Sequence, residues 1–176
     1  PILSEVGVDT TDEDTPLTIA LSASDIDGDD LSFTAESGDE NVTCSVSGNQ
    51  LTLTPVTNWN GTVSISVTVT DGFLTDSETF VLTVVPVNDT PELAPITSPD
   101  AVSEDGANIE VSVTPTDEDV GALLTVSVST NNSSLFPAGT ITVSPQTGGP
   151  GVERTITMDP PDNQNGTGLV TVSVTD

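Results

Sequence analysis

Positive charge is almost absent from this chain of 176 residues, which holds 28 acidic residues and a single basic residue, Arg154. The formal net charge is −27. Nucleic-acid binding depends on Lys and Arg at the phosphates, so this composition argues against it. An anionic membrane surface would repel the chain for the same reason. The carboxylates therefore lack side-chain cations with which to pair.

Histidine, lysine and tyrosine are missing, and Cys44 is the only cysteine. One cysteine cannot form an intrachain disulfide. Cys44 shares a strand face with two valines, so we expect a buried, small apolar residue rather than a reactive thiol. Zinc and copper prefer His and Cys ligands, and nucleophilic catalysis needs groups that this chain lacks, so we expect neither a zinc site nor an enzyme. No run is long enough to span a membrane, and no signal peptide is visible.

The chain does have a strong period-two alternation of apolar and small polar residues. Val63, Ile65, Val67 and Val69 alternate with Thr and Ser, which predicts a strand with one buried face. Similar runs occur at 17–21, 51–53, 81–85, 109–113, 125–128 and 170–174. Ser-Gly-Asn-Gln at 47–50 predicts a hairpin turn. No helical period persists, and short strands between turn signals predict an all-β sandwich.

The motifs recur in the same order, which indicates an internal repeat. The pairs are Pro-Ile-Leu at 1–3 with Pro-Glu-Leu at 91–93, Glu-Asp at 13–14 with 104–105, Asp-Ile-Asp at 25–27 with Asp-Glu-Asp at 117–119, and Asn-Trp-Asn-Gly-Thr at 58–62 with Asn-Gln-Asn-Gly-Thr at 163–167. A Thr-Asp pair ends the following strand in both copies. We predict two tandem domains, 1–89 and 90–176, each with a modest core.

The second copy differs from the first in two respects. It carries extra Gly- and Pro-rich sequence at 131–154, and it stops at Asp176, where the first copy continues to a final strand. We therefore expect the second domain to lack its last strand and to expose a sheet edge. This interpretation makes the chain a fragment of a longer tandem array.

Acidic clusters at 12–14 and 117–119 flank the junction Asn-Asp-Thr-Pro at 88–91. Two carboxylates about 4 Å apart repel by roughly 4 kcal/mol at an effective dielectric of 20. Calcium takes six to eight oxygen ligands from such groups, so calcium is the expected metal. A solvated acidic surface is the alternative. An EF-hand loop at 25–36 is a weaker alternative, because Asp30 stands where that loop needs Gly.

These motifs together resemble the cadherin-like tandem repeats of large bacterial surface proteins, including adhesins secreted by type I systems. The matching elements are Glu-Asp-Thr-Pro at 13–16, Ser-Asp-Ile-Asp-Gly-Asp at 24–29, the motif at 58–62, Val-Thr-Asp-Gly at 69–72 and Val-Asn-Asp-Thr-Pro at 87–91. They cover the first copy, and the second copy matches more loosely. The resemblance implies Greek-key β-sandwiches strung end to end, with calcium at the junctions.

The resemblance also implies a ligand set. At the junction between the two domains it consists of Glu13, Asn88, Asp89, Asp117, Asp119 and Asp176. Asp25, Asp27 and Asp71 would form the equivalent half-site of the first domain. The sequence departs from cadherins at 58–61, where Asn replaces an acidic loop. Asn there could supply carbonyl ligands or could simply form a turn.

The function that follows is a calcium-rigidified extracellular spacer or adhesion module, located at the cell surface. Its expected partners are neighbouring repeats of the same chain, with host or surface glycans or proteins bound through other domains. We expect a monomer with no nucleic-acid partner and no membrane insertion. The alternative is a carbohydrate- or protein-binding module that uses residues 131–154, because loops on rigid sandwiches often carry binding. The scarcity of aromatic residues argues against that alternative.

Overall fold

The computed structural model describes residues 1–7, 9–103 and 105–176. The chain divides into two compact units, Pro1–Val87 (unit 1) and Asn88–Asp176 (unit 2). The described residues form strands and turns without a helix, and hence without a helix able to cross a membrane. Glu104, the counterpart of Glu13 in the repeat, lies outside the described residues.

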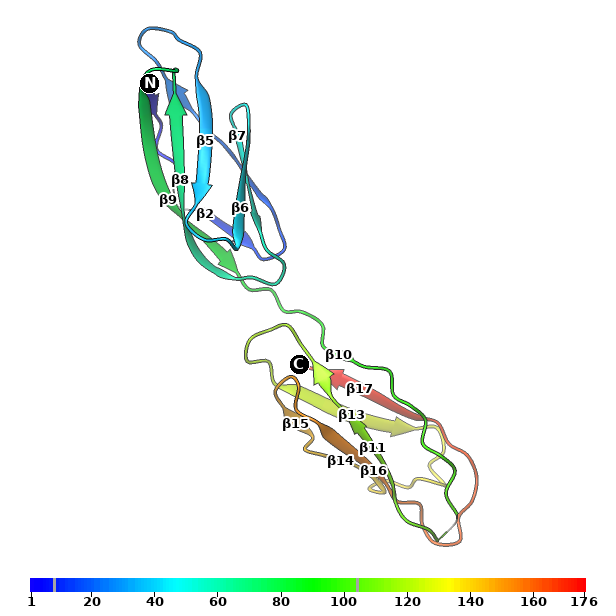
Figure 1. Ribbon diagram of the computed structural model, residues 1–176. Coiled ribbons are helices and arrows are strands. Elements are labelled where there is room, and N and C mark those ends of the chain that lie inside the picture. Colours follow the sequence, from blue (N-terminus) through cyan, green and yellow to red (C-terminus); the bar gives the residue numbers. More distant parts are fainter. Residues whose placement is uncertain (8, 104) are drawn as a thin grey trace. The chain divides into compact units, whose positions relative to one another are not determined.

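Unit 1 is a sandwich of two main sheets (Figure 1). Its strands are β1 (Ile2–Leu3), β2 (Asp9–Asp12), β3 (Leu17–Ala20), β4 (Ala23–Ser24), β5 (Ser32–Ser37), β6 (Val42–Ser47), β7 (Gln50–Pro55), β8 (Gly61–Thr70) and β9 (Thr75–Val85). One sheet has the order β2-β9-β8-β5 and the other β3-β7-β6, and β1 pairs with β4. The predicted hairpin turn is confirmed between β6 and β7, where Gly48 has a φ of 60°.

The alternation in β8 explains the core of unit 1. Ile65, Val67 and Val69 are completely buried, while the Thr and Ser residues between them lie on the other face. Trp59 packs partly buried against the same core, which supports a packing role for it. Cys44 is also partly buried there, and burial raises the pKa of its thiol. These side chains fill one continuous interior between the two sheets.

Unit 2 repeats this plan with fewer strands. They are β10 (Glu92–Leu93), β11 (Ile109–Val113), β12 (Pro115–Thr116), β13 (Leu124–Thr130), β14 (Ile141–Ser144), β15 (Thr147–Gly148), β16 (Arg154–Met158) and β17 (Val170–Thr175). The sheet β11-β16-β14 has the order of β3-β7-β6, and β13 pairs with β17 as β5 pairs with β8. The expected all-β fold with two sandwiches is confirmed, and the described part of unit 2 has no counterpart of β9.

The segment 131–154 is not a simple insertion. It contains β14 and β15, and its last residue begins β16, so much of it is regular sheet. Leu135 and Phe136 are 7% and 6% exposed and pack in the core of unit 2. The apolar residues that suggested a binding loop therefore stabilise the fold, which weakens the alternative of ligand binding through this segment.

Candidate metal centre

The first part of the candidate site is the acidic turn that follows β12. The backbone N–H of Asp119 donates to Oδ1 of Asp117 over 2.8 Å, so one oxygen of Asp117 holds the turn. Its other oxygen, Oδ2, is buried and has no hydrogen-bond partner. A buried carboxylate oxygen without a partner is costly, so Asp117 Oδ2 calls for a ligand from outside the protein.

The first two residues of unit 2 lie against this turn. The side-chain amide of Asn88 donates to Oδ2 of Asp176 over 2.6 Å, at the end of β17. The backbone N–H of Asp89 donates to Oδ2 of Asp119 over 2.7 Å. Within unit 2 the structure thus brings together the residues of this unit that were expected at the junction: Asn88, Asp89, Asp117, Asp119 and Asp176.

Three carboxylates converge at this point. Asp117, Asp119 and Asp176 each place an oxygen within 4.8 Å of the others. Arg154 cannot compensate them, because its guanidinium is completely buried elsewhere in unit 2 and donates to the backbone carbonyls of Leu124, Gly148, Gly149 and Val152. A hard divalent cation with oxygen ligands fits this set, since three carboxylates and adjacent backbone carbonyls supply the donors that calcium prefers.

Unit 1 has an equivalent acidic cluster after β4. Oδ1 of Asp25 accepts the backbone N–H groups of Asp27, Gly28 and Asp29 over 2.8, 3.1 and 3.5 Å. The carboxylates of Asp25, Asp27 and Asp29 lie within 4.8 Å of one another. Asp29 was not among the expected ligands, although its place in Asp-x-Asp-Gly-Asp was a signal that could have identified it.

Asp25 and Asp71 both lie beside Pro1. The amino group of Pro1 lies 3.0 Å from Oδ2 of Asp25 and 3.7 Å from Oδ2 of Asp71. The hydrogen bond from this ammonium lowers the pKa of Asp25, together with the N–H of Asp27. The N–H groups of Leu74 and Phe73 lower the pKa of Asp71.

Glu13 lies at the other end of unit 1, beside the end of β9. It is 5% exposed, and its Oε1 accepts the backbone N–H of Val87 over 2.6 Å. Its Oε2 accepts the side-chain amide of Asn60 over 3.2 Å. Asn60 therefore orients Glu13, and Glu13 in turn fixes the last residue of unit 1.

A hydrogen bond that occurs in both units explains why the Glu-Asp and Asn-x-Asn-Gly motifs recur together. Oδ1 of Asp14 accepts the backbone N–H of Asn58 over 2.9 Å, and Oδ1 of Asp105 accepts that of Asn163 over 2.7 Å. These four residues have φ values of 56–60° and are the non-glycine residues of the described chain with positive φ. The Asp of each Glu-Asp motif therefore holds the Asn-x-Asn-Gly turn.

The EF-hand alternative is wrong for 25–36. Glu36, which would supply the last ligand, lies within β5 and pairs with Ser66 of β8. A residue fixed in the sheet cannot close a helix-flanked calcium loop. The acidic residues of this segment form a loop between β4 and β5 instead.

Residues 1–83 match the bacterial Ig domain family. This match covers almost all of unit 1, which is therefore similar to bacterial Ig domains. No curated protein matches the chain by sequence. Among solved structures, a protocadherin gammaB7 EC3-6 cis-dimer is 18% identical with a TM-score of 0.53, and the match covers 99% of this chain and 46% of that chain. Human protocadherin-24 EC1-2 is 14% identical with a TM-score of 0.54, over 96% of this chain and 89% of that chain.

These likenesses concern the fold. Unit 1 matches the bacterial Ig domain family, and the two units share strand orders. With the protocadherin folds, this confirms the expected resemblance to cadherin-like, Ig-like sandwiches. The chain spans less than half of the protocadherin gammaB7 structure, so its length matches only a part of such an array.

Proposed function

We propose that this chain is a spacer and adhesion module of a repetitive bacterial surface protein, and that calcium binds at the start of unit 2. The observation that carries the proposal is the buried, unpartnered Oδ2 of Asp117 beside the carboxylates of Asp119 and Asp176. The bacterial Ig domain and the cadherin-like fold support an extracellular location and repeat neighbours in the same chain. The proposed module is a non-enzymatic monomer.

The proposed ligands at the start of unit 2 are Asp117, Asp119 and Asp176, with Asn88 and Asp89 contributing oxygen atoms of the connecting chain. When bound, calcium supplies a positive charge that compensates the three carboxylates. Asp119 already holds the N–H of Asp89, and Asp176 holds the amide of Asn88. Compensation of these carboxylates keeps both hydrogen bonds in place and orders the backbone that directly follows unit 1.

The chain on the other side of this connection is held by Glu13, which accepts the N–H of Val87. We propose Glu13 as the ligand that unit 1 contributes, and Asp25, Asp27 and Asp71 as the corresponding ligands at the start of unit 1. Glu13 holds Val87, and Asp176 and Asp119 hold Asn88 and Asp89. Few dihedral angles of the connection therefore remain free to rotate. Restriction of these angles is the proposed physical basis of a stiff spacer.

Calcium titration by calorimetry tests the proposal on three forms of the full chain. The variant Asp117→Asn/Asp119→Asn retains hydrogen-bond acceptors but lowers the ligand charge, and the matched control Glu118→Gln removes one charge from an exposed neighbour outside the cluster. We expect the control to bind calcium as the parent chain does and the double variant to lose one class of site. Affinities of about 10⁻⁴ to 10⁻³ M are typical of extracellular modules.

Solution scattering tests the mechanical part separately. Chelation of calcium should change the radius of gyration of the parent chain, because the released connection samples more conformations, and should leave that of the double variant unchanged. Unchanged scattering and an unchanged melting temperature between millimolar calcium and chelator would contradict the proposed function.

A further inference from the structure

The Glu-Asp motif of unit 1 holds the turn 56–61 at two points. Oδ1 of Asp14 accepts the backbone N–H of Asn58 over 2.9 Å, and Oε2 of Glu13 accepts the side-chain amide of Asn60 over 3.2 Å. Two consecutive carboxylates therefore hold two alternate asparagines of one short turn. Trp59 stands between these asparagines, so its backbone links the two contacts.

Trp59 is itself fixed by its backbone and by its ring. Its backbone N–H donates to the carbonyl of Val56 over 3.1 Å. Its ring lies against Gly61, where an added Cβ atom would stand 3.1 Å from Cζ2 and 3.5 Å from Cη2 of the ring. Gly61 has a φ of 152°, which favours glycine, so this position admits the close approach of the ring. The same ring packs against the core of unit 1.

The ring of Trp59 thereby restrains Asn60, the residue between it and Gly61. Gly61 pairs with Val84 of β9, so the chain after Asn60 belongs to the sheet. The chain before Asn60 is held by the contacts of Trp59. A side chain on a backbone that is already fixed loses less conformational entropy when it forms a hydrogen bond. The contact of Asn60 with Glu13 is therefore prepared by the ring.

Unit 2 provides a comparison within the same chain, because the second copy has Gln164 in place of tryptophan. The glycine of its turn, Gly166, has no ring against it among the described residues, and an added Cβ atom would meet a side-chain nitrogen of Asn132 at 4.0 Å. Asp105 nevertheless holds the N–H of Asn163 over 2.7 Å. The contact of the Asp thus forms without an aromatic residue, so the ring in unit 1 serves the contact of the Glu.

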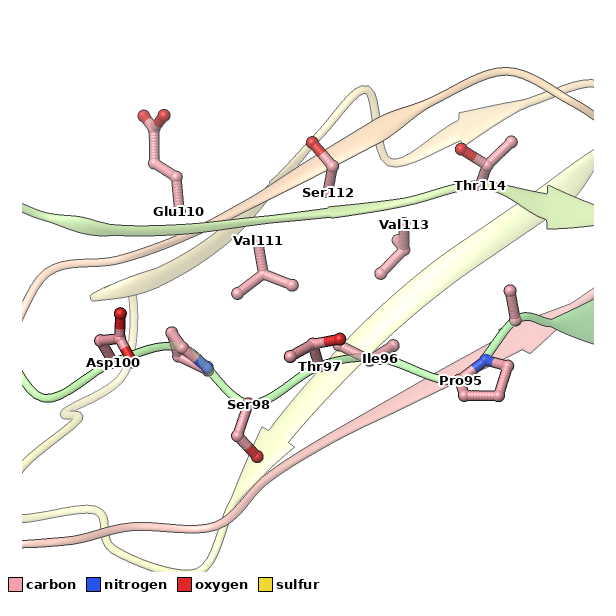
Figure 2. A pocket seen from close by; sticks show the side chains of 12 residues that line it. Pro95, Ile96, Thr97, Ser98, Asp100, Glu110, Val111, Ser112, Val113 and Thr114 are labelled. Atoms are coloured by element: carbon pink, nitrogen blue, oxygen red, sulfur yellow. The ribbon is translucent and has the colours of Figure 1, made fainter.

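The grooves of unit 2 lack this kind of directed contact on the side of β11. A groove of about 590 Å³ lies between the segment 94–100 and β11. Figure 2 shows Val111 and Val113 pointing toward this segment, while Glu110 and Ser112 point away from it. Val111 and Val113 belong to the core of unit 2. On this side the groove therefore meets core side chains, whereas the turn 56–61 orients a carboxylate.

We propose that Trp59 is the positioning residue of Glu13. The ring holds the turn at Gly61, the amide of Asn60 then holds Oε2 of Glu13, and Oε1 accepts the N–H of Val87 over 2.6 Å. The last residue of unit 1 is thus ordered from the core outward, through a ring, a turn and a carboxylate. The consequence for calcium rests on the proposed function, in which Glu13 is a ligand, but the ordering of Val87 needs no ion.

Amide hydrogen exchange of Val87 in the full chain, measured in chelator, tests this order of contacts. Trp59→Gln introduces the residue that the second copy has, and we expect it to speed exchange of Val87 about tenfold, as the weakening of a hydrogen bond to a charged group predicts. Trp59→Phe keeps a ring and should restore most of the protection. The matched control is Val69→Ala, since Val69 is completely buried in the same core at the other end of β8 and should leave Val87 nearly unchanged.

The reverse measurement uses the emission of Trp59, which is the only tryptophan of the chain. Coupling between two sites is reciprocal, so a change at Glu13 must reach the ring. Glu13→Ala should shift the emission to longer wavelength and increase quenching by acrylamide, because the released turn exposes the ring. Val69→Ala, which leaves the turn intact, should change neither.

Equal acceleration of Val87 exchange by Trp59→Gln and Val69→Ala would overturn the proposal, because general loss of stability would then explain both. Unchanged exchange in Trp59→Gln, or unchanged emission in Glu13→Ala, would overturn it as well. Calcium titration separates this result from the proposed function. Loss of Val87 protection in Trp59→Gln, in a chain whose parent form binds no calcium, would support the positioning role and contradict only the proposed function.

Discussion

Asp117→Asn should change the stability of unit 2 in opposite directions with and without calcium. In the parent chain, oxygens of Asp117, Asp119 and Asp176 lie within 4.8 Å of one another. Two unit charges at that separation repel by about 1 kcal/mol in water and by about 3.5 kcal/mol at an effective dielectric of 20. Asp176 is exposed and Asp117 is partly buried, so the lower half of this range applies.

In chelator, the substitution removes the repulsion of Asp117 with two neighbours. It also places an amide N–H group where the buried Oδ2 has no partner, while its remaining oxygen can still accept the N–H of Asp119. We therefore expect unit 2 to gain about 1–2 kcal/mol in its free energy of unfolding. Differential scanning calorimetry of the full chain measures this as a higher transition temperature for unit 2.

In calcium, the sign should reverse. The parent chain gains about 2.7 kcal/mol at a hundredfold excess of calcium over the dissociation constant, and the variant gains less because it offers the ion one charge fewer. Glu118→Gln is the control, since it removes the same charge outside the cluster and should change little in either condition. Equal signs in both conditions would refute the assignment of Asp117 as a ligand, because simple charge repulsion would then explain the whole effect.

Three further predictions concern the fold that carries the site. Asp14→Ala should lower the free energy of unfolding of unit 1 by about 0.5–1.5 kcal/mol, and Asp105→Ala that of unit 2 by as much, because each removes an exposed hydrogen bond to a turn N–H. Urea denaturation measures both effects, and Asp→Asn at the same positions should cost clearly less. Leu82→Ala should destabilise unit 1 by about 2–5 kcal/mol in the same assay, since Leu82 is completely buried, and an unchanged midpoint would contradict that packing. At a given pH, the Cys44 thiol should react with a disulfide reagent more slowly than free cysteine does. Its rate should rise as the pH approaches its raised pKa, because only the thiolate attacks. Equal rates in native buffer and in urea would contradict its burial.

Local patterns predicted the sheets well because the side-chain period of a strand is visible in the sequence. The alternation at 63–69 gave β8 and its buried face, and Ser-Gly-Asn-Gln gave the turn between β6 and β7. The candidate site at the start of unit 2 was predictable only through the order of repeated motifs together with the resemblance to cadherin-like repeats, which implied the ligands. That order placed Asn88, Asp89 and the three carboxylates at loop ends, and the hydrogen bonds that join them lie within unit 2.

Hydrogen bonds and contacts between residues far apart in the sequence were not predictable, because no repeating pattern in the sequence marks which residues will meet. The hydrogen bond from Asn58 to Asp14 joins residues 44 positions apart, and both residues adopt the left-handed conformation. Burial of Phe136 opposite Gly168 depends on a long connection whose path the sequence does not reveal.

The burial of Arg154 bears on how the acidic surface as a whole is compensated. Its guanidinium donates to three backbone carbonyls of the turn 148–152 and to that of Leu124 in β13. The single basic side chain therefore holds the fold together and does not act as a counter-charge. Cations from solution must therefore compensate the acidic side chains. Where carboxylates are dispersed, any salt screens them within a Debye length, and sodium serves as well as calcium. In the cluster of Asp117, Asp119 and Asp176, three carboxylates converge around a buried oxygen without a hydrogen-bond partner. An ion that exchanges its water for oxygen ligands would stabilise such a cluster more than screening by salt does. This difference distinguishes the cluster from an ordinary acidic surface.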